Sequence, residues 1–104
     1  MGTLVYDARA LDLQIDDRTL AHLRVVFMTK LRRGESFMLE VPIAEGSAGR
    51  RSLWIHPAVP LVFHFHSSRS VALNRAWLDD LLLSASGPDG LKLLPEPTEP
   101  DSSK

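Results

Sequence analysis

Residues 16–34, DDRTLAHLRVVFMTKLRRG, decide the fold, because they form the longest segment with the periodicity of an amphipathic helix. The two aspartates at its start can accept hydrogen bonds from free backbone amides, and Gly34 is a typical helix stop. The apolar positions recur at spacings of three and four residues and predict one buried stripe: Leu20, Leu23, Phe27 and Leu31. We therefore expect a helix over residues 17–33 that packs on a sheet.

Short runs that are typical of β-strands lie on both sides of this helix. The expected strands cover residues 3–6, 10–15, 36–43, 51–56, 61–66 and 91–94, and residues 7–9 and 57–60 are expected hairpin turns. A second helix is predicted to start at Ser70 or Asn74 and to end near Gly87. The order is β-β-α-β-β-β-α-β. We predict an α+β domain with a largely antiparallel sheet and two helices packed on one face.

The length of 104 residues fits a single domain, which we place at residues 1–95. Residues 96–104 are rich in proline and acidic side chains, and we predict a disordered tail there. The chain has no cysteine, no apolar run of bilayer length and no signal-peptide pattern at its start. We therefore expect a cytoplasmic protein without membrane contact.

Basic residues are concentrated in the first predicted helix, although the formal net charge is -1. No acidic residue lies between Arg18 and Arg33, and arginine side chains bind phosphates through paired hydrogen bonds. The candidate nucleic-acid-binding residues are Arg18, His22, Arg32, Arg33, Arg50 and Arg51, and Arg69 and Arg75 are further candidates for an anion-binding surface. The alternative is a solvated helix face whose charge is balanced by Glu35, Asp79 and Asp80.

Three histidines lie in or beside the two strands that flank the turn at 57–60. His64 and His66 share one strand face, and His56 approaches them if the hairpin forms. Zinc needs three or four ligands, and neither strand supplies a cysteine or a carboxylate. A polar sheet face is the favoured interpretation, and we expect neither metal nor cofactor.

Aromatic residues in these strands allow two interpretations. Trp54, Phe63 and Phe65 can stack on bases, as aromatic residues do in single-strand-binding proteins. Aromatic residues in alternating strands are more commonly part of the core, and we favour that interpretation here.

Five phrases resemble a family of short, uncharacterised bacterial proteins: MGTLVYD at 1–7, DRTLAHL at 17–23, KLRRGESF at 30–37, WIHP at 54–57 and NRAW at 74–77. The resemblance covers the chain to about residue 97. Members of this family frequently carry the name "ATP-dependent DNA ligase". The resemblance therefore implies a ligase, and this implication can be compared with the residues.

A ligase of that kind needs a lysine nucleophile in a Lys-x-Asp-Gly motif. The chain has one Asp-Gly pair, Asp89-Gly90, and glycine stands two positions before Asp89. Neither a Gly-x-Ser-x-Gly elbow, nor a phosphate-binding loop, nor a dinucleotide fingerprint occurs. We therefore predict a non-enzymatic binding domain.

Nucleic acid is the first predicted partner, through the basic helix. The alternative is a protein-interaction module or a homodimer. Edge strands pair readily, and Val25, Met28, Met38 and Val59 are more apolar residues than one thin core requires.

Overall fold

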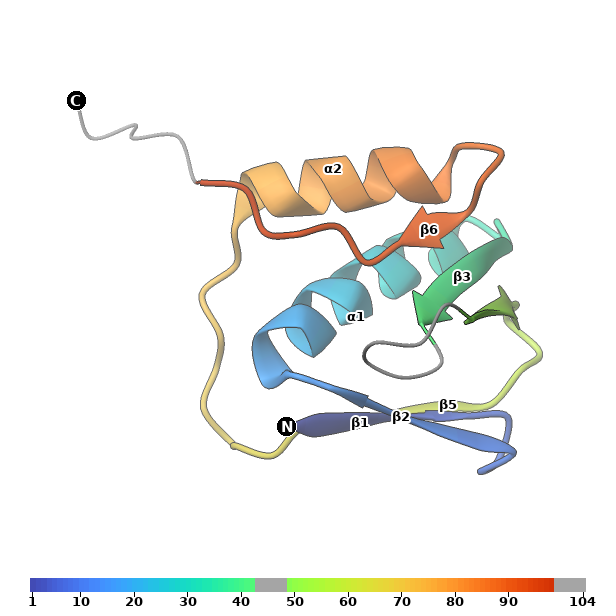
Figure 1. The fold of residues 1–104 in the computed structure, drawn as a ribbon, viewed down its shortest axis with the longest axis horizontal. Helices are drawn as coiled ribbons and strands as arrows, with labels where there is room; N and C mark the ends of the chain where they lie inside the picture. Colours follow the sequence, from blue (N-terminus) through green and yellow to red (C-terminus); the bar gives the residue numbers. More distant parts are fainter. Residues whose placement is uncertain (43–48, 99–104) are drawn as a thin grey trace.

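The chain alternates short strands with two helices in the predicted order (Figure 1). The computed structural model describes residues 1–42 and 49–98. Its elements are β1 Gly2–Tyr6, β2 Leu11–Ile15, α1 Asp17–Arg32, β3 Phe37–Pro42, β4 Arg50–Ile55, β5 Leu61–His64, α2 Arg75–Ala85 and β6 Leu91–Lys92. The α+β class, the element order and the largely antiparallel pairing are confirmed.

The strands divide between two three-stranded sheets. One sheet has the order β2-β1-β5 and is antiparallel throughout; the other has the order β4-β3-β6, in which only β3 and β6 are parallel. The predicted hairpin of residues 51–56 with 61–66 is therefore wrong, because β4 pairs with β3 and β5 pairs with β1. The turn between them carries the chain from one sheet to the other, where the carbonyl of Pro60 accepts a hydrogen bond from the amide of Asp7 at 2.9 Å.

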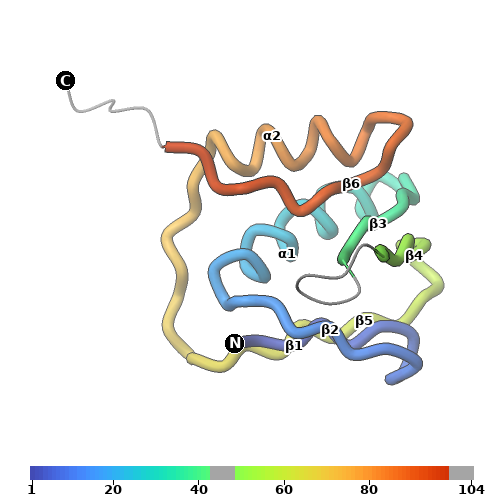
Figure 2. Tube along the Cα trace, viewed as in Figure 1, coloured from blue at the N-terminus to red at the C-terminus, as the bar shows by residue number. Residues whose placement is uncertain are grey.

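Helix α1 lies between the β2-β1-β5 sheet and α2, as Figures 1 and 2 show. Leu20, Leu23 and Phe27 of the predicted stripe are buried. The ring of Phe27 contacts Phe63 of β5 edge-on at 5.4 Å and Phe37 of β3 at 5.2 Å, measured between ring centroids. One aromatic side chain of α1 thus joins the two sheets into a single core.

Local capping explains where the helices begin. The carboxylate of Asp16 accepts a hydrogen bond from the amide of Thr19 at 3.0 Å, and Asn74 caps α2 by accepting from the amide of Trp77 at 3.2 Å. Of the two candidate caps for each helix, Asp16 and Asn74 are the ones used. Within the described residues, neither helix has the length and apolar character that a bilayer crossing requires.

The C-terminal strand depends on a glycine. Gly90 has a φ of 79°, and a Cβ there would lie 2.8 Å from the carbonyl oxygen of Met38. The close approach lets β6 pair with β3. Two residues beyond β6, the carbonyl of Leu94 accepts a hydrogen bond from the indole of Trp77 at 3.0 Å. The chain thereby stays in contact with α2 after β6 ends.

The turn between β1 and β2 contains consecutive residues with positive φ. Asp7, Ala8 and Arg9 have φ values of 52°, 53° and 71°, and none of them is glycine. A residue with a Cβ is less stable than glycine in this left-handed region. Backbone strain is therefore concentrated in the turn.

Ala8→Gly should raise the free energy of unfolding by about 0.5–1 kcal/mol, because glycine adopts the left-handed conformation without steric cost. Urea unfolding followed by circular dichroism measures the change. Ala58→Gly is the control, since Ala58 is an exposed turn residue outside the positive-φ set. Equal destabilisation by both substitutions would contradict a strained 7–9 turn.

Candidate ligand-binding cleft

Residues 65–73, called the strap below, connect β5 to α2 without helix or strand (Figure 1, yellow to orange trace). Its first end is held by α1. The carboxylate of Asp17 accepts hydrogen bonds from the backbone amides of His66 at 3.0 Å and Ser67 at 2.9 Å. These two bonds favour the ionised form and lower the pKa of Asp17 below its usual value of 3.8.

The second end of the strap is held by Arg18, the next residue of α1, and by His22, about one turn further along the helix. The guanidinium of Arg18 donates to the carbonyl of Ala72 at 2.9 Å. The backbone amide of Asn74 donates to Nε2 of His22 at 2.8 Å, and Nδ1 of the same ring lies 2.7 Å from the carbonyl oxygen of Arg18. Since Nε2 accepts, Nδ1 carries the proton and donates to that carbonyl. The imidazole thereby links α1 to the start of α2.

The carboxylate of Glu96 completes this arrangement. Arg18 binds it with both arms of its fork, through Nε to Oε1 at 2.7 Å and through Nη2 to Oε2 at 2.6 Å. The side-chain amide of Asn74 adds a bond to Oε2 at 2.9 Å and another to the carbonyl of Pro97 at 3.0 Å. The hydrogen bonds from Arg18 and Asn74 hold the pKa of Glu96 at about 2. We call Arg18, His22, Asn74 and Glu96 the polar clamp.

The clamp also bears on the predicted tail. Glu96 and Pro97 contact the domain, two residues beyond the predicted boundary at residue 95. Residues 99–104 of that tail lie outside the described residues.

A cleft of about 660 Å³ lies between α1 and the strap. Its apolar lining is Ala21 and Val25 from α1 and Phe65, Val71 and Leu73 from the strap. The strap is anchored by α1 at both ends, and the cleft opens between these anchors. Asp17 and Arg18 at the start of α1 therefore position the strap, and Ala21 and Val25 further along the helix supply the floor of the cleft.

Two arginines give the cleft its charge. Arg24 from α1 and Arg69 from the strap both line it and are exposed. In residues 1–42 and 49–98, neither guanidinium is within ion-pair distance of a carboxylate. Of the other arginines, Arg9, Arg18, Arg50 and Arg75 have such partners, whereas Arg32, Arg33 and Arg51 have none among the described residues. The cleft thus offers two cations and an apolar floor to an anionic ligand.

The structure does not gather the six predicted nucleic-acid-binding residues on one surface. Arg18 is engaged in the clamp, and His22 is fully buried beside Trp77, with ring centroids 4.4 Å apart, because α2 covers that side of α1. The expectation of a surface-exposed His22 is therefore wrong, whereas Arg18 is partly exposed with its guanidinium bound to Glu96.

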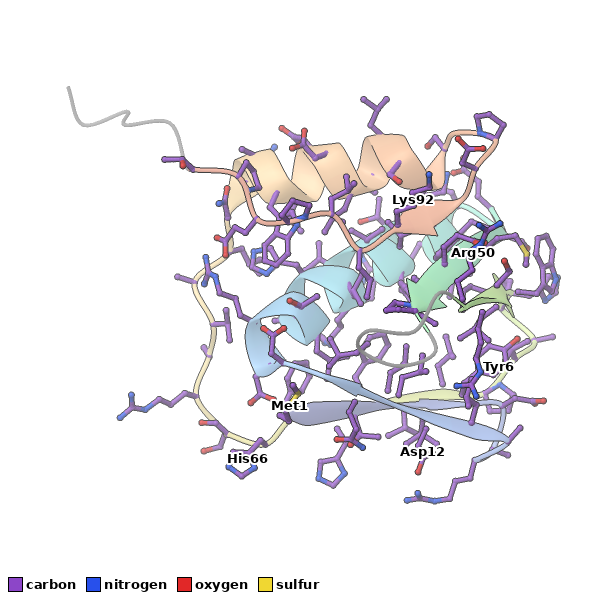
Figure 3. All side chains as sticks on the ribbon, in the orientation of Figure 1. Met1, Tyr6, Asp12, Arg50, His66 and Lys92 are labelled. Atoms are coloured by element: carbon purple, nitrogen blue, oxygen red, sulfur yellow. The ribbon has the colours of Figure 1, made fainter. Side chains whose placement is uncertain are left out.

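The other four predicted arginines are exposed but separated. Arg32 and Arg33 lie at the far end of α1, about 21 Å along the helix from Arg18. Arg50 and Arg51 belong to β4 in the other sheet, and Arg50 binds Glu40 at 3.0 Å. Figure 3 shows Arg50 and the strap residue His66 on opposite sides of the molecule.

Sequence reasoning included Arg69 among the candidates but missed Arg24 and did not predict that the two line one cleft. The helical pattern places Arg24 beside the core stripe. No feature of the neighbouring sequence indicates that residues 65–73 lie next to it. The polar run of residues 67–70, SSRS, was the available signal of an irregular segment.

The three histidines of the metal hypothesis also remain apart. No group of three or more potential metal ligands occurs within the described parts of the chain. His64 ends β5 and His66 lies in the strap, whereas His56 follows β4 and stacks on Trp54 with ring centroids 6.4 Å apart. The separation follows from the absence of the predicted β4–β5 hairpin.

A family model covers residues 1–96 and describes a domain of unknown function, DUF7882. The chain belongs to this family. The matched region contains every residue of the clamp and of the cleft. No curated protein and no solved structure matches the chain.

The polar clamp generates a prediction about acid stability. The pKa of Glu96 is about 2 in the folded state, against an ordinary value of 4.5, so its ionised form favours folding. This contribution is complete above pH 4.5 and is lost as the pH falls towards 2. Glu96→Gln should therefore lower the urea midpoint at pH 7 and flatten the loss of stability between pH 4.5 and 2.

Asp79→Asn is the matched control, because that carboxylate is exposed and lies 3.8 Å from Arg75. It should leave the urea midpoint nearly unchanged. If Glu96→Gln and Asp79→Asn had the same pH profile as the parent protein, the clamp would not contribute to stability.

Proposed function

We propose that the protein is a small non-enzymatic domain that binds nucleic acid through the exposed side of α1 and the strap. The observation that carries this proposal is the pair Arg24 and Arg69, whose charges are not neutralised by any carboxylate of the described residues. Arginine forks bind phosphate oxygens with paired hydrogen bonds. The partner is nucleic acid, as predicted from the sequence. The contact surface now consists of the exposed side of α1 and the strap.

The exposed side of α1 extends the charge beyond the cleft. At 100° per residue, Ala21, Arg24, Val25, Met28 and Arg32 fall within a sector of about 100°, opposite the buried Leu23. Arg24 and Arg32 are about 12 Å apart along the helix axis, so they can contact different phosphates. We call Arg24, Arg32 and Arg69 the basic face.

The charge of the whole chain limits how strong this binding is. A net charge of -1 gives no general attraction to nucleic acid, so the affinity depends on the few phosphates that reach the basic face. Binding should therefore be measurable at low salt and fall steeply as salt is added.

The ligase implied by the family resemblance receives less support from the residues. Lys30 is buried, and its ammonium binds the carboxylate of Glu35 at 2.8 Å and the hydroxyl of Ser86 at 3.1 Å. A lysine held in this way is not free to attack a nucleotide phosphate. We therefore favour binding without catalysis.

A protein-interaction module is the second proposal, and one observation favours it. Trp54 is 50% exposed on β4, which is an edge strand of its sheet. Exposed tryptophan is enriched at protein interfaces. Light scattering at high concentration should then show a dimer that Trp54→Ser weakens, and a monomer at all concentrations would contradict self-association.

Fluorescence polarisation with labelled oligonucleotides at low salt tests the nucleic-acid proposal. Arg24→Gln combined with Arg69→Gln should weaken binding and reduce the slope of log K against log salt by about 1.4 on single strands, because two phosphate contacts are lost. Arg9→Gln combined with Arg75→Gln removes the same charge from two ion-paired sites and should change the slope little. Flat titrations with both single and double strands would contradict the proposal.

A further inference from the structure

The cleft has an apolar lining and two cationic side chains. A nucleotide has a flat base and anionic phosphates, which match these two features. We infer that the cleft holds one unstacked nucleotide of a single-stranded nucleic acid, with the base on the apolar lining and the phosphates at Arg24 and Arg69. This inference rests on the proposed function and adds to it a preference for single strands over duplexes.

The apolar lining is accessible to a flat ligand. Leu73 is 46% exposed, and Phe65, Val71 and Val25 are half-buried around it. The bases of a duplex are stacked on one another, whereas an unstacked base has free faces that pack on aromatic and apolar side chains. A cleft lined in this way therefore selects a strand whose base can leave the stack.

Two elements supply the positive charge of the cleft. Arg24 lines the cleft from α1 and Arg69 lines it from the strap, so a phosphate can be approached by guanidinium groups from both elements. The hydroxyls of Ser68 and Ser70 also line the cleft and can donate to or accept from the edge of a base or a sugar. These groups recognise a phosphate and a polar edge without selecting one base.

The anchoring of the strap means that the cleft exists before a ligand binds. Asp17 fixes the amides of His66 and Ser67, and Arg18 fixes the carbonyl of Ala72. Binding therefore does not have to order the whole segment, and this lowers its entropic cost. The section between the anchors is the part that can adjust to the base.

Paired titrations test the inference with a short oligothymidylate, a duplex of equal length and thymidine monophosphate as a competitor. Leu73→Ser and, separately, Val71→Ser should weaken single-strand binding roughly fivefold, the equivalent of about 1 kcal/mol, and leave duplex binding unchanged. Leu83→Ser is the control, because Leu83 is 76% exposed on α2 and outside the cleft. Equal urea midpoints would show that the variants remain folded.

The outcomes separate this inference from the function on which it rests. Binding to both strand types, with equal losses or none in the two cleft variants, would overturn the inference and leave nucleic-acid binding in place. No binding to either strand type would overturn both. A monophosphate that competes as well as the oligonucleotide would replace the strand by a free nucleotide as the ligand.

Discussion

The paired hydrogen bonds between Arg18 and Glu96 are the interaction on which the arrangement of the chain depends. They connect the first turn of α1 to the C-terminal segment, and Asn74 and His22 extend the connection to α2 and the strap. The ion pair itself is partly exposed, with 43% and 30% of the two side chains accessible, so its Coulomb energy in solvent is modest. Its importance lies in the buried groups that it orients. His22 and Asn74 are almost fully buried, and an unsatisfied buried polar group costs about 1–3 kcal/mol.

A second polar contact at the other end of α1 complements the clamp. The ammonium of Lys30 is buried between Glu35, which follows the helix, and Ser86, which ends α2. The pair of helices is therefore fixed by directional contacts near both ends, with apolar packing between them. Apolar packing alone tolerates small shifts of one helix along another, whereas hydrogen bonds define a single register. This rigidity is what lets α1 serve as the fixed wall of the cleft.

The elements that depend on local chemistry were predictable, and those that depend on distant contacts were not. The start of α1 follows from Asp16 and the start of α2 from Asn74, because a cap acts within four residues. The division into two sheets depends on the direction in which the chain continues after the turn at 57–60, because this direction decides which strand β5 pairs with. The composition of a turn does not specify that direction. His22 was predicted to bind nucleic acid at the surface, and nothing in the helical pattern shows that α2 covers the side of α1 on which it lies. The cleft was not predictable, since it arises where an irregular segment crosses the helix.

The charged residues of α1 have two different roles. Asp17, Arg18 and Lys30 make contacts that hold the fold together, while Arg24 and Arg32 face solvent on the side that α2 leaves uncovered. A run of basic residues in sequence is therefore not a basic surface, because its members project in different directions. Only the second group remains available to a partner, and together with Arg69 it is the physical basis of the proposed binding surface.

Amide hydrogen exchange measured by NMR tests the central claim that α1 anchors the strap at both ends. The amides of His66, Ser67 and Asn74 donate to Asp17 and His22, so they should exchange on the order of a hundredfold more slowly than those of Ser68, Ser70 and Val71 between them. Anchoring by α1 at both ends predicts this pattern, in which the ends are protected and Ser68, Ser70 and Val71 are not. Uniformly fast exchange across residues 66–74 would contradict it.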